Sequence, residues 1–248
     1  MQQNLLLISS LLSLLIGTVV GLSQIKVKRL LAFSSITHVG FLLLALSIYT
    51  QKSIDSFIFY LVQYSITNLN IFLILLAFAY LTSTAASLGT GKQINDINYL
   101  IELKGELYKN PILSISLAIC LFSMAGIPPL IGFFSKQFVL FSSIENGNYF
   151  LSIVAILISV ISASYYLKLI KLTFFEIADK SNADTHLSEA SLRAHNNQEY
   201  YAIKEQGSLS QLHSYIISIL SCIILLFFLD PTVILNGTQL ISLTIFHL

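Results

Sequence analysis

Six long apolar stretches divide the chain, and short polar segments separate them. A membrane hydrocarbon core of about 30 Å needs about 20 apolar residues of helix. Stretches that reach or nearly reach this length cover residues 4–23, 30–50, 56–81, 112–144, 149–175 and 212–229. They lack the alternation of a barrel strand, and only helices satisfy their own backbone at this length in lipid. The pattern therefore predicts an all-α, polytopic transmembrane helix bundle forming a single domain over residues 1–230.

The polar segments predict two long loops and leave the C-terminal segment undecided. Residues 82–111 begin with small polar residues and continue into an expected surface helix over 94–107. Residues 177–211 have no apolar periodicity, and their His186 and His195 lack the spacing of a metal site. Residues 231–248 are short and carry several polar side chains. They form either a short span or an interfacial helix.

Composition agrees with a membrane protein and excludes several other classes. Of the 248 residues, 55% are hydrophobic and 10% are charged, with a mean hydropathy of +0.80. A soluble domain carries about 25% charged residues. The 13 basic and 12 acidic side chains nearly cancel, so no field would attract nucleic acid. Nucleic acid is therefore not an expected partner, whereas the lipid bilayer is.

Basic residues of the polar segments fall almost entirely on one side of the expected membrane. If Met1 starts on the outer side, Lys52 alone is assigned to the outer loops. The inner side then receives Lys26, Lys28, Arg29, Lys92, Lys104, Lys109, Lys168, Lys171, Lys180, Arg193 and Lys204. The positive-inside rule places that side in the cytoplasm or organelle matrix, so the N-terminus is expected outside.

The apolar stretch 112–144 is too long to be one uninterrupted membrane helix. A single helix of this length would run about 50 Å, and Gly126, Pro128, Pro129 and Gly132 lie in its middle. Two consecutive prolines remove amide donors and push the preceding residue out of the helical region. We expect a helix broken at residues 126–132, a feature that marks ion and substrate paths in transporters. The alternative is a proline kink without a role in transport.

Lys136 follows this break at a depth that is unusual for a charged side chain. It lies about 13 Å along a helix axis from the outer end, beyond the reach of a snorkelling stem. A central lysine costs about 2.5–3.5 kcal/mol on insertion scales, so it is expected to face the bundle interior. Burial disfavours the ammonium form, which lets such a group load and release a proton. We predict Lys136 as a proton-transfer residue; the alternative is a structural lysine paired with a buried acid.

Other polar side chains lie at a similar depth. His38 is about 12 Å into the second span, and histidine is suited to proton relay because its unperturbed pKa is about 6.5. Tyr60, Tyr64 and Asn68 recur every four residues and so share one helix face. They are candidates to form a relay or to line a water chain. The alternatives are a packing histidine and ordinary interhelical hydrogen bonds.

Four further residues receive no functional role from the sequence. Tyr165 and Tyr166 lie near the inner end of their span, where an aromatic belt explains them. Cys120 and Cys222 lie inside apolar stretches, so neither a disulfide nor a metal site is expected. The chain also has no Gly-rich phosphate loop and no Cys-x-x-Cys motif. We therefore expect no metal and no cofactor bound by this chain.

Several motifs resemble the antiporter-like subunits of respiratory complex I, the proton-pumping NADH:ubiquinone oxidoreductase. Residues 28–40 resemble the start of one helix of these subunits, and Phe59-Tyr60-Leu61 with Tyr64 resembles the next helix of the subunit 2 branch. The sequences Phe-Ser-Met-Ala-Gly-Ile-Pro-Pro at 122–129 and Gly-Phe-Phe-Ser-Lys at 132–136 resemble the broken-helix signature of that branch. This last resemblance is the most specific.

The resemblance implies a proton-translocating module of two inverted five-helix repeats, each with one broken helix and a midplane lysine. It covers roughly residues 17 to 230 and corresponds to the second repeat only, with one or two further C-terminal helices. Lys136 matches the lysine that the family places on the proton exit path. We expect either a split gene, with a separate chain carrying the first repeat, or a truncated chain.

The function implied by the resemblance is that of a membrane-arm subunit of complex I. Such a subunit takes part in proton translocation coupled to electron transfer from NADH to ubiquinone, without redox chemistry of its own. NADH, FMN, iron–sulfur clusters and ubiquinone are expected in partner subunits. The absence of Trp suits an AT-rich organelle genome, which favours the mitochondrial inner membrane with the N-terminus in the intermembrane space. Alternatives are a subunit of a multisubunit cation/proton antiporter and a structural membrane scaffold.

Overall fold

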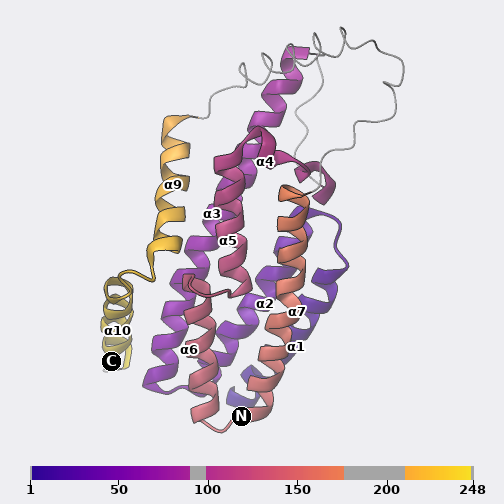
Figure 1. Ribbon diagram of the computed structural model, residues 1–248. Helices are drawn as coiled ribbons and strands as arrows, with labels where there is room; N and C mark the ends of the chain where they lie inside the picture. Colours follow the sequence, from indigo (N-terminus) through magenta and orange to yellow (C-terminus); the bar gives the residue numbers. More distant parts are fainter. Residues whose placement is uncertain (1, 90–98, 176–209, 247–248) are drawn as a thin grey trace.

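The computed structural model describes residues 2–89, 99–175 and 210–246, which form a bundle of α-helices (Figure 1). These described residues contain no strand, and their one extended contact is an isolated antiparallel bridge between Lys26 and Tyr99. Four helical segments are long and apolar enough to cross a membrane: Gln3–Leu22, Val27–Ile48, Gln51–Leu81 and Tyr149–Phe174. The all-α membrane fold expected from the apolar pattern is confirmed.

The first three helices are α1 (Gln2–Leu22), α2 (Val27–Ile48) and α3 (Gln51–Gly89). Helix α3 extends beyond both ends of the predicted span 56–81. Its last part covers residues 82–89, which we expected to begin a loop. Alanine and leucine in this segment have high helix propensity, so the small polar residues between them do not end the helix.

The segment before the broken helix differs from the expected surface helix over 94–107. Its described part forms a short 3₁₀ helix η1 (Leu100–Leu103) and one turn of α-helix, α4 (Glu106–Lys109), while residues 90–98 lie outside the described residues. Leu100 and Leu103 are buried in the main core. Their packing against the bundle explains why this segment follows the end of the bundle and does not form a separate helix at the membrane surface.

Helices α5 (Pro111–Ala125) and α6 (Ile131–Glu145) are the two halves of the predicted broken helix. Residues 126–130 between them are not helical, which confirms the interruption. The break is shorter than the expected 126–132, because Gly132 lies in the first turn of α6. Pro111 occupies the start of α5, where a missing amide hydrogen does no harm.

The remaining described helices are α7 (Tyr149–Phe174), α9 (Gln211–Leu226) and α10 (Thr232–Phe246). Most of the predicted loop 177–211, including His186 and His195, lies outside the described residues. Helix α10 has 15 residues, which is about 22 Å and shorter than the length that a full span needs. It lies beside α3 at the lower end of the bundle in Figure 1.

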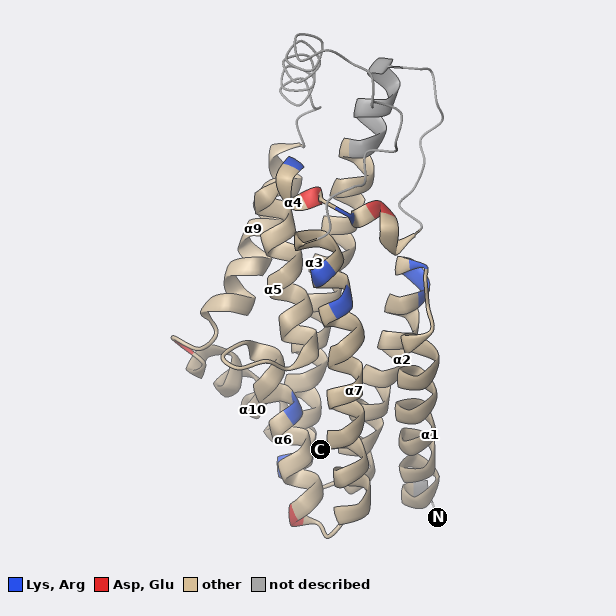
Figure 2. Cartoon of the chain, turned by 45° about the vertical axis from the view of Figure 1, so that its right-hand side comes forward, with Lys and Arg blue, Asp and Glu red and all other residues tan. Residues whose placement is uncertain are grey.

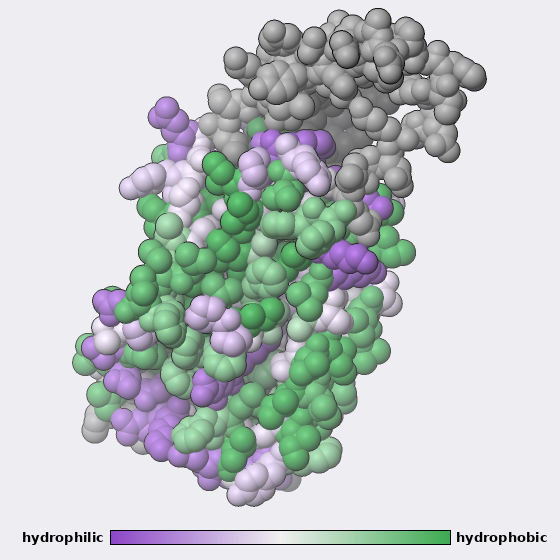
Figure 3. Space-filling model, viewed as in Figure 1, coloured by the Kyte–Doolittle hydropathy of each residue, from purple (hydrophilic) through white to green (hydrophobic). Residues whose placement is uncertain are grey.

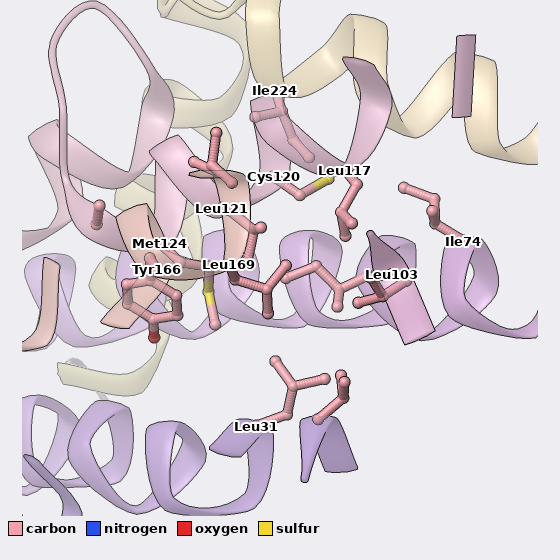
Figure 4. Close-up of a cluster of buried hydrophobic side chains, with 14 of the residues drawn as sticks. Leu31, Ile74, Leu103, Leu117, Cys120, Leu121, Met124, Tyr166, Leu169 and Ile224 are labelled. Atoms are coloured by element: carbon pink, nitrogen blue, oxygen red, sulfur yellow. The ribbon is translucent and has the colours of Figure 1, made fainter. Parts of the chain in front are cut away.

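Buried apolar side chains join α2, α3, α5, α7 and α9 into one core. Leu31, Ile74, Leu117, Leu169 and Ile224 are among those that converge there (Figure 4). Large apolar side chains also cover the outer sides of the helices, and green atoms spread over the visible face between its two ends (Figure 3). A lateral surface of this kind is suited to lipid or to neighbouring membrane helices.

The two ends of the bundle differ in charge. Most described Lys and Arg residues lie toward the end that holds α4, as the blue segments in Figure 2 show. We call this the basic end, and we call the end with the turn between α6 and α7 the Glu145 end. Helix α6 carries Lys136 between these two ends. The direction of the bundle across a membrane remains a prediction from this asymmetry.

Gly132 offers a test of how tightly the two half-helices pack. A Cβ atom at this position would overlap the carbonyl oxygen of Ser123 in α5, whereas a Cβ atom at Gly237 in α10 would meet nothing. We expect Gly132→Ala to lower the free energy of unfolding by about 1–3 kcal/mol through overpacking. The melting temperature of the purified chain in detergent measures this change. Gly237→Ala is the matched control, and equal melting temperatures of the two variants would contradict the close packing.

Candidate functional site

The break begins with a glycine that ends α5. Gly126 adopts a left-handed conformation with φ of 86°, which suits glycine because it has no Cβ atom. The Gly126 amide donates to the carbonyls of Phe122 and Ser123, and the Ile127 amide also donates to Phe122 at 3.1 Å. This is a Schellman-type ending, which satisfies some of the last carbonyls of the helix. The carbonyls of Met124 and Ala125 remain available for other donors.

The Lys136 amine binds those two carbonyls. Its Nζ atom donates to the oxygen of Met124 at 2.9 Å and to that of Ala125 at 3.0 Å. The side chain is 8% exposed. Lys136 lies on α6 and reaches back to the end of α5, so the two halves of the broken helix are joined by one side chain. The C-terminal end of a helix carries partial negative charge, which stabilises a cation there.

No carboxylate among the described residues pairs with Lys136. The ion pairs described in this bundle include Lys52 with Glu145 at the Glu145 end and Lys109 with Glu106 in α4. Besides the two carbonyls, Lys136 faces the aromatic ring of Phe41 in α2, with Nζ 5.7 Å from the ring centre. The buried charge is therefore balanced by peptide dipoles and an aromatic ring.

His38 is the centre of a second polar cluster. Its Nδ1 atom is hydrogen-bonded to the hydroxyl of Tyr60 at 2.8 Å, and its Nε2 atom to the hydroxyl of Tyr166 at 3.1 Å. The imidazole stacks on the ring of Tyr64, with centroids 4.9 Å apart. The Tyr166 hydroxyl is also hydrogen-bonded to Ser34. Helices α2, α3 and α7 thus contribute to one buried row of hydrogen bonds.

Two contacts connect the His38 cluster with the surroundings of Lys136. The ring of Phe41 stacks on Tyr60 at 5.8 Å and also faces the Lys136 amine. Next to Lys136, the Ser135 hydroxyl donates to the Gln63 side chain of α3 at 3.2 Å. Helix α2 therefore presents an aromatic ring to the lysine, and α3 presents a polar side chain beside it. The two clusters occupy one continuous region of the bundle interior.

The structure brings together most of the residues that the sequence singled out. Lys136, His38, Tyr60 and Tyr64 all lie in this region. Asn68 does not join them; it is half-buried and makes no hydrogen bond with the described residues. Its separation follows from the path of α3, which by this point lies beyond His38. The roles of all these residues in proton transfer remain predictions.

Sequence reasoning assigned Tyr165 and Tyr166 to an aromatic belt, and this was wrong. Both side chains are buried, at 2% and 0% exposure, because they point into the bundle from α7. Tyr166 completes the His38 row. The sequence carries no signal for this role, because Tyr166 meets Ser34 and His38 only through the packing of α7 against α2. Phe41, which contacts Lys136, was also missed, because nothing distinguishes it from other apolar residues.

The described residues contain no group of three or more His, Cys, Asp or Glu that could hold a metal ion. Cys120 is buried and Cys222 is exposed, and both are free thiols. The site is therefore built from an amine, an imidazole, hydroxyls, an amide and backbone carbonyls. Groups of this kind can hold and pass protons.

Comparisons with known proteins place the chain among similar sequences and folds. Residues 1–162 match the family described as NADH:quinone oxidoreductase/Mrp antiporter, transmembrane. NADH-ubiquinone oxidoreductase chain 2 from Rhizopus oryzae is 49% identical over 247 residues, which cover 98% of this chain and 46% of that relative. The chain thus spans about half the length of the curated relative.

Two solved structures have a similar fold. The Mrp complex from Dietzia sp. DQ12-45-1b gives a TM-score of 0.72 at 18% identity, over 97% of this chain and 46% of that one. Respiratory complex I from Thermus thermophilus with bound NADH gives a TM-score of 0.67 at 22% identity, over 97% and 43%. At these identities the likeness concerns the fold alone.

Tyr166 offers a test of the His38 row. Tyr166→Phe removes the hydroxyl that satisfies the Nε2 atom of His38, and a buried polar atom without a partner costs about 1–3 kcal/mol. We expect the free energy of unfolding to fall by that amount, measured by denaturation in detergent. Tyr149→Phe is the matched control on the same helix, since Tyr149 is 62% exposed. Equal stability of the two variants would show that the hydrogen bond to His38 contributes nothing.

Proposed function

The chain belongs to the NADH:quinone oxidoreductase/Mrp antiporter transmembrane family, and on that basis we propose that it is a membrane-arm component of NADH:ubiquinone oxidoreductase, complex I. In this proposal it takes part in proton translocation coupled to electron transfer from NADH to ubiquinone. It supplies the half-module with the broken-helix lysine. NADH, FMN, iron–sulfur clusters and ubiquinone belong to partner subunits.

The observation that carries the proposal is the way in which Lys136 is held. Its amine meets two carbonyl oxygens and no carboxylate of the described residues. An ion-paired lysine that lost its proton would leave a buried carboxylate uncompensated, at about 3–5 kcal/mol. Against carbonyls, both the ammonium and the neutral amine can donate hydrogen bonds. Both protonation states fit the same site, which supports a lysine that exchanges protons.

The His38 row supports a proton supply from the basic end. A neutral imidazole has one donor and one acceptor nitrogen, and tyrosine hydroxyls can do either. Reversing the hydrogen bonds on both sides of His38 exchanges its tautomer and carries one proton along the row between Tyr60 and Ser34. Ser34 is buried about two turns from the start of α2, on the side of His38 that faces the basic end. We propose that protons reach the region of Lys136 along this row.

The energy for transport must come from outside this chain. Moving one charge against 100 mV requires about 2.3 kcal/mol. At an effective dielectric constant of about 20, a unit charge that appears about 8 Å from Lys136 changes its energy by about 2 kcal/mol. One charge displacement in a neighbouring subunit is therefore of the required size. Electrostatic coupling to partner subunits is the simplest mechanism consistent with this site.

The partners and location follow from the same proposal. The partners are other membrane-arm subunits of complex I, including a separate chain that carries the first antiporter-like repeat. The relative from Rhizopus oryzae is about twice as long as this chain, so a single polypeptide there is long enough for two such repeats. The location is the mitochondrial inner membrane, with the basic end in the matrix and the N-terminus in the intermembrane space.

A cation/proton antiporter subunit is the second candidate function. The matched family and the structural likeness to the Dietzia complex both include this class. Copurification with flavin and iron–sulfur proteins would support the complex I proposal. Sodium-dependent proton flux in their absence would support the antiporter. A purely structural scaffold is less well supported, because Lys136 has no carboxylate partner in the described part of the chain.

Lys136→Ala tests the proposal. We expect the variant to assemble but to translocate fewer protons per NADH oxidised, with the flux through this module reduced about 100-fold because its proton-transfer group is lost. Proton uptake and NADH oxidation in membrane vesicles measure both quantities. Lys168→Ala is the control, since Lys168 is exposed near the basic end. Unchanged pumping by an assembled Lys136→Ala complex would refute the proposed role.

A further inference from the structure

A cavity opens near the Glu145 end, away from the hydrogen bonds of Lys136 and His38. Its volume is about 290 Å³, enough for several water molecules at about 30 Å³ each. Helices α3, α6 and α10 line it. Apolar side chains make up most of its lining surface: Phe59, Phe138, Phe141 and Leu235. The polar lining residues are Lys52, Asp55, Ser56, Ser142, Thr238 and Gln239.

Asp55 is the unexplained group in this cavity. Its Oδ1 atom is buried and has no hydrogen-bond partner among the described residues. The nearby amine of Lys52 is bound to Glu145 instead, at 2.9 and 3.2 Å from the two carboxylate oxygens. A buried carboxylate oxygen without a partner is costly unless water or a proton satisfies it. If the cavity holds water, water molecules can donate hydrogen bonds to the Asp55 oxygen and can also deliver a proton to it.

The packing of α3 against α6 relates this cavity to Lys136. Two polar contacts join these helices: Gln63 with Ser135, beside Lys136, and Ser56 with Ser142, on the cavity wall. Both pairs are one heptad apart on their helices, which is about 10 Å. Between them the rings of Phe59 and Phe138 meet edge to face, with centroids 5.4 Å apart. The contact between these two rings therefore separates the lysine site from the cavity.

We propose that this cavity is the proton outlet of the module and that Asp55 is its acceptor. The Lys136 ammonium gives one proton through water to the Asp55 carboxylate, which becomes neutral, and Asp55 then releases that proton to the solvent at the Glu145 end. The Phe59–Phe138 contact must part for water to connect the two groups. This inference rests on the proposed function, because it takes Lys136 as the donor.

An anionic lipid headgroup fits the cavity less well than water does. Its phosphate would face the Asp55 carboxylate, and the one lysine of the lining is already paired with Glu145. Serine, threonine and glutamine side chains, by contrast, both donate and accept hydrogen bonds. They can hold a chain of water molecules in either orientation.

The first experiment compares Asp55→Asn, Asp55→Glu and Lys136→Ala in the assembled complex. We expect Asp55→Asn to reduce the protons translocated per NADH oxidised about as much as Lys136→Ala does, and Asp55→Glu to keep most of the pumping. Asp230→Asn is the control, since Asp230 is exposed and does not line the cavity. The amount of assembled complex is measured for each variant.

The outcomes separate the two claims. Normal pumping by an assembled Asp55→Asn complex, with reduced pumping by Lys136→Ala, overturns the outlet and leaves the proposed function intact. Normal pumping by both variants overturns the proposed function as well. Reduced pumping by Asp55→Asn that Asp55→Glu restores supports the outlet.

The second experiment tests the wet cavity without relying on pumping. In a Cys222→Ser background, Ser142→Cys places a thiol in the cavity wall, and we expect a small charged thiol reagent added at the Glu145 face to react with it. Ser143→Cys is the matched control, because Ser143 is buried against Ser152 at 2.9 Å and does not line the cavity. Labelling of Ser142→Cys no faster than that of Ser143→Cys overturns the proposal, even if Asp55→Asn fails to assemble.

Discussion

The hydrogen bonds from Lys136 to the last carbonyls of α5 are the interaction on which the rest of the site depends. A helix that ends inside a membrane leaves carbonyl oxygens without partners, and a lysine inside a membrane needs a partner for its charge. In this protein the unpaired carbonyls supply the partners that the lysine needs. The Lys136 amine satisfies Met124 and Ala125, so the break and the buried amine stabilise one another.

This arrangement explains why the break can exist at such depth. Irregular backbone at membrane depth is tolerated where it is enclosed by protein or faces water. The amides of Gly126 and Ile127 donate to carbonyls of α5 and so end that helix. Because Gly132 has no Cβ atom, its backbone can lie against the Ser123 carbonyl. The Gly132 amide donates to the Ser123 hydroxyl at 3.2 Å. The groups freed by the break are therefore taken up by a few neighbouring side chains and not by lipid.

Helix α3 gives the bundle interior its polar character. One part of its surface, with Tyr60 and Tyr64, contacts His38, and another part, with Gln63, contacts α6 beside Lys136. Its longer extent also places Asp55 at the cavity near the Glu145 end. A single long helix thus contacts the His38 row, the lysine site and the cavity. This layout places the polar groups that contact α3 along one helix, while exposed apolar side chains of α1 and α7 cover part of the outside.

The sequence by itself determined the class of fold and the main chemical groups. Apolar stretches of this length must be helical in lipid, two consecutive prolines in the interior of a helix interrupt it, and a lysine at that depth must face the interior. These constraints are local, and they led to the break and to Lys136. The tertiary structure alone decided which groups meet. Tyr166 looked like a belt residue until α7 was seen to pack against α2, and Asn68 shared a helix face with Tyr60 without reaching the site. Phe41, the carbonyls of Met124 and Ala125, and the cavity around Asp55 depend on contacts between helices distant in sequence, where the local pattern of residues carries no information on the partner.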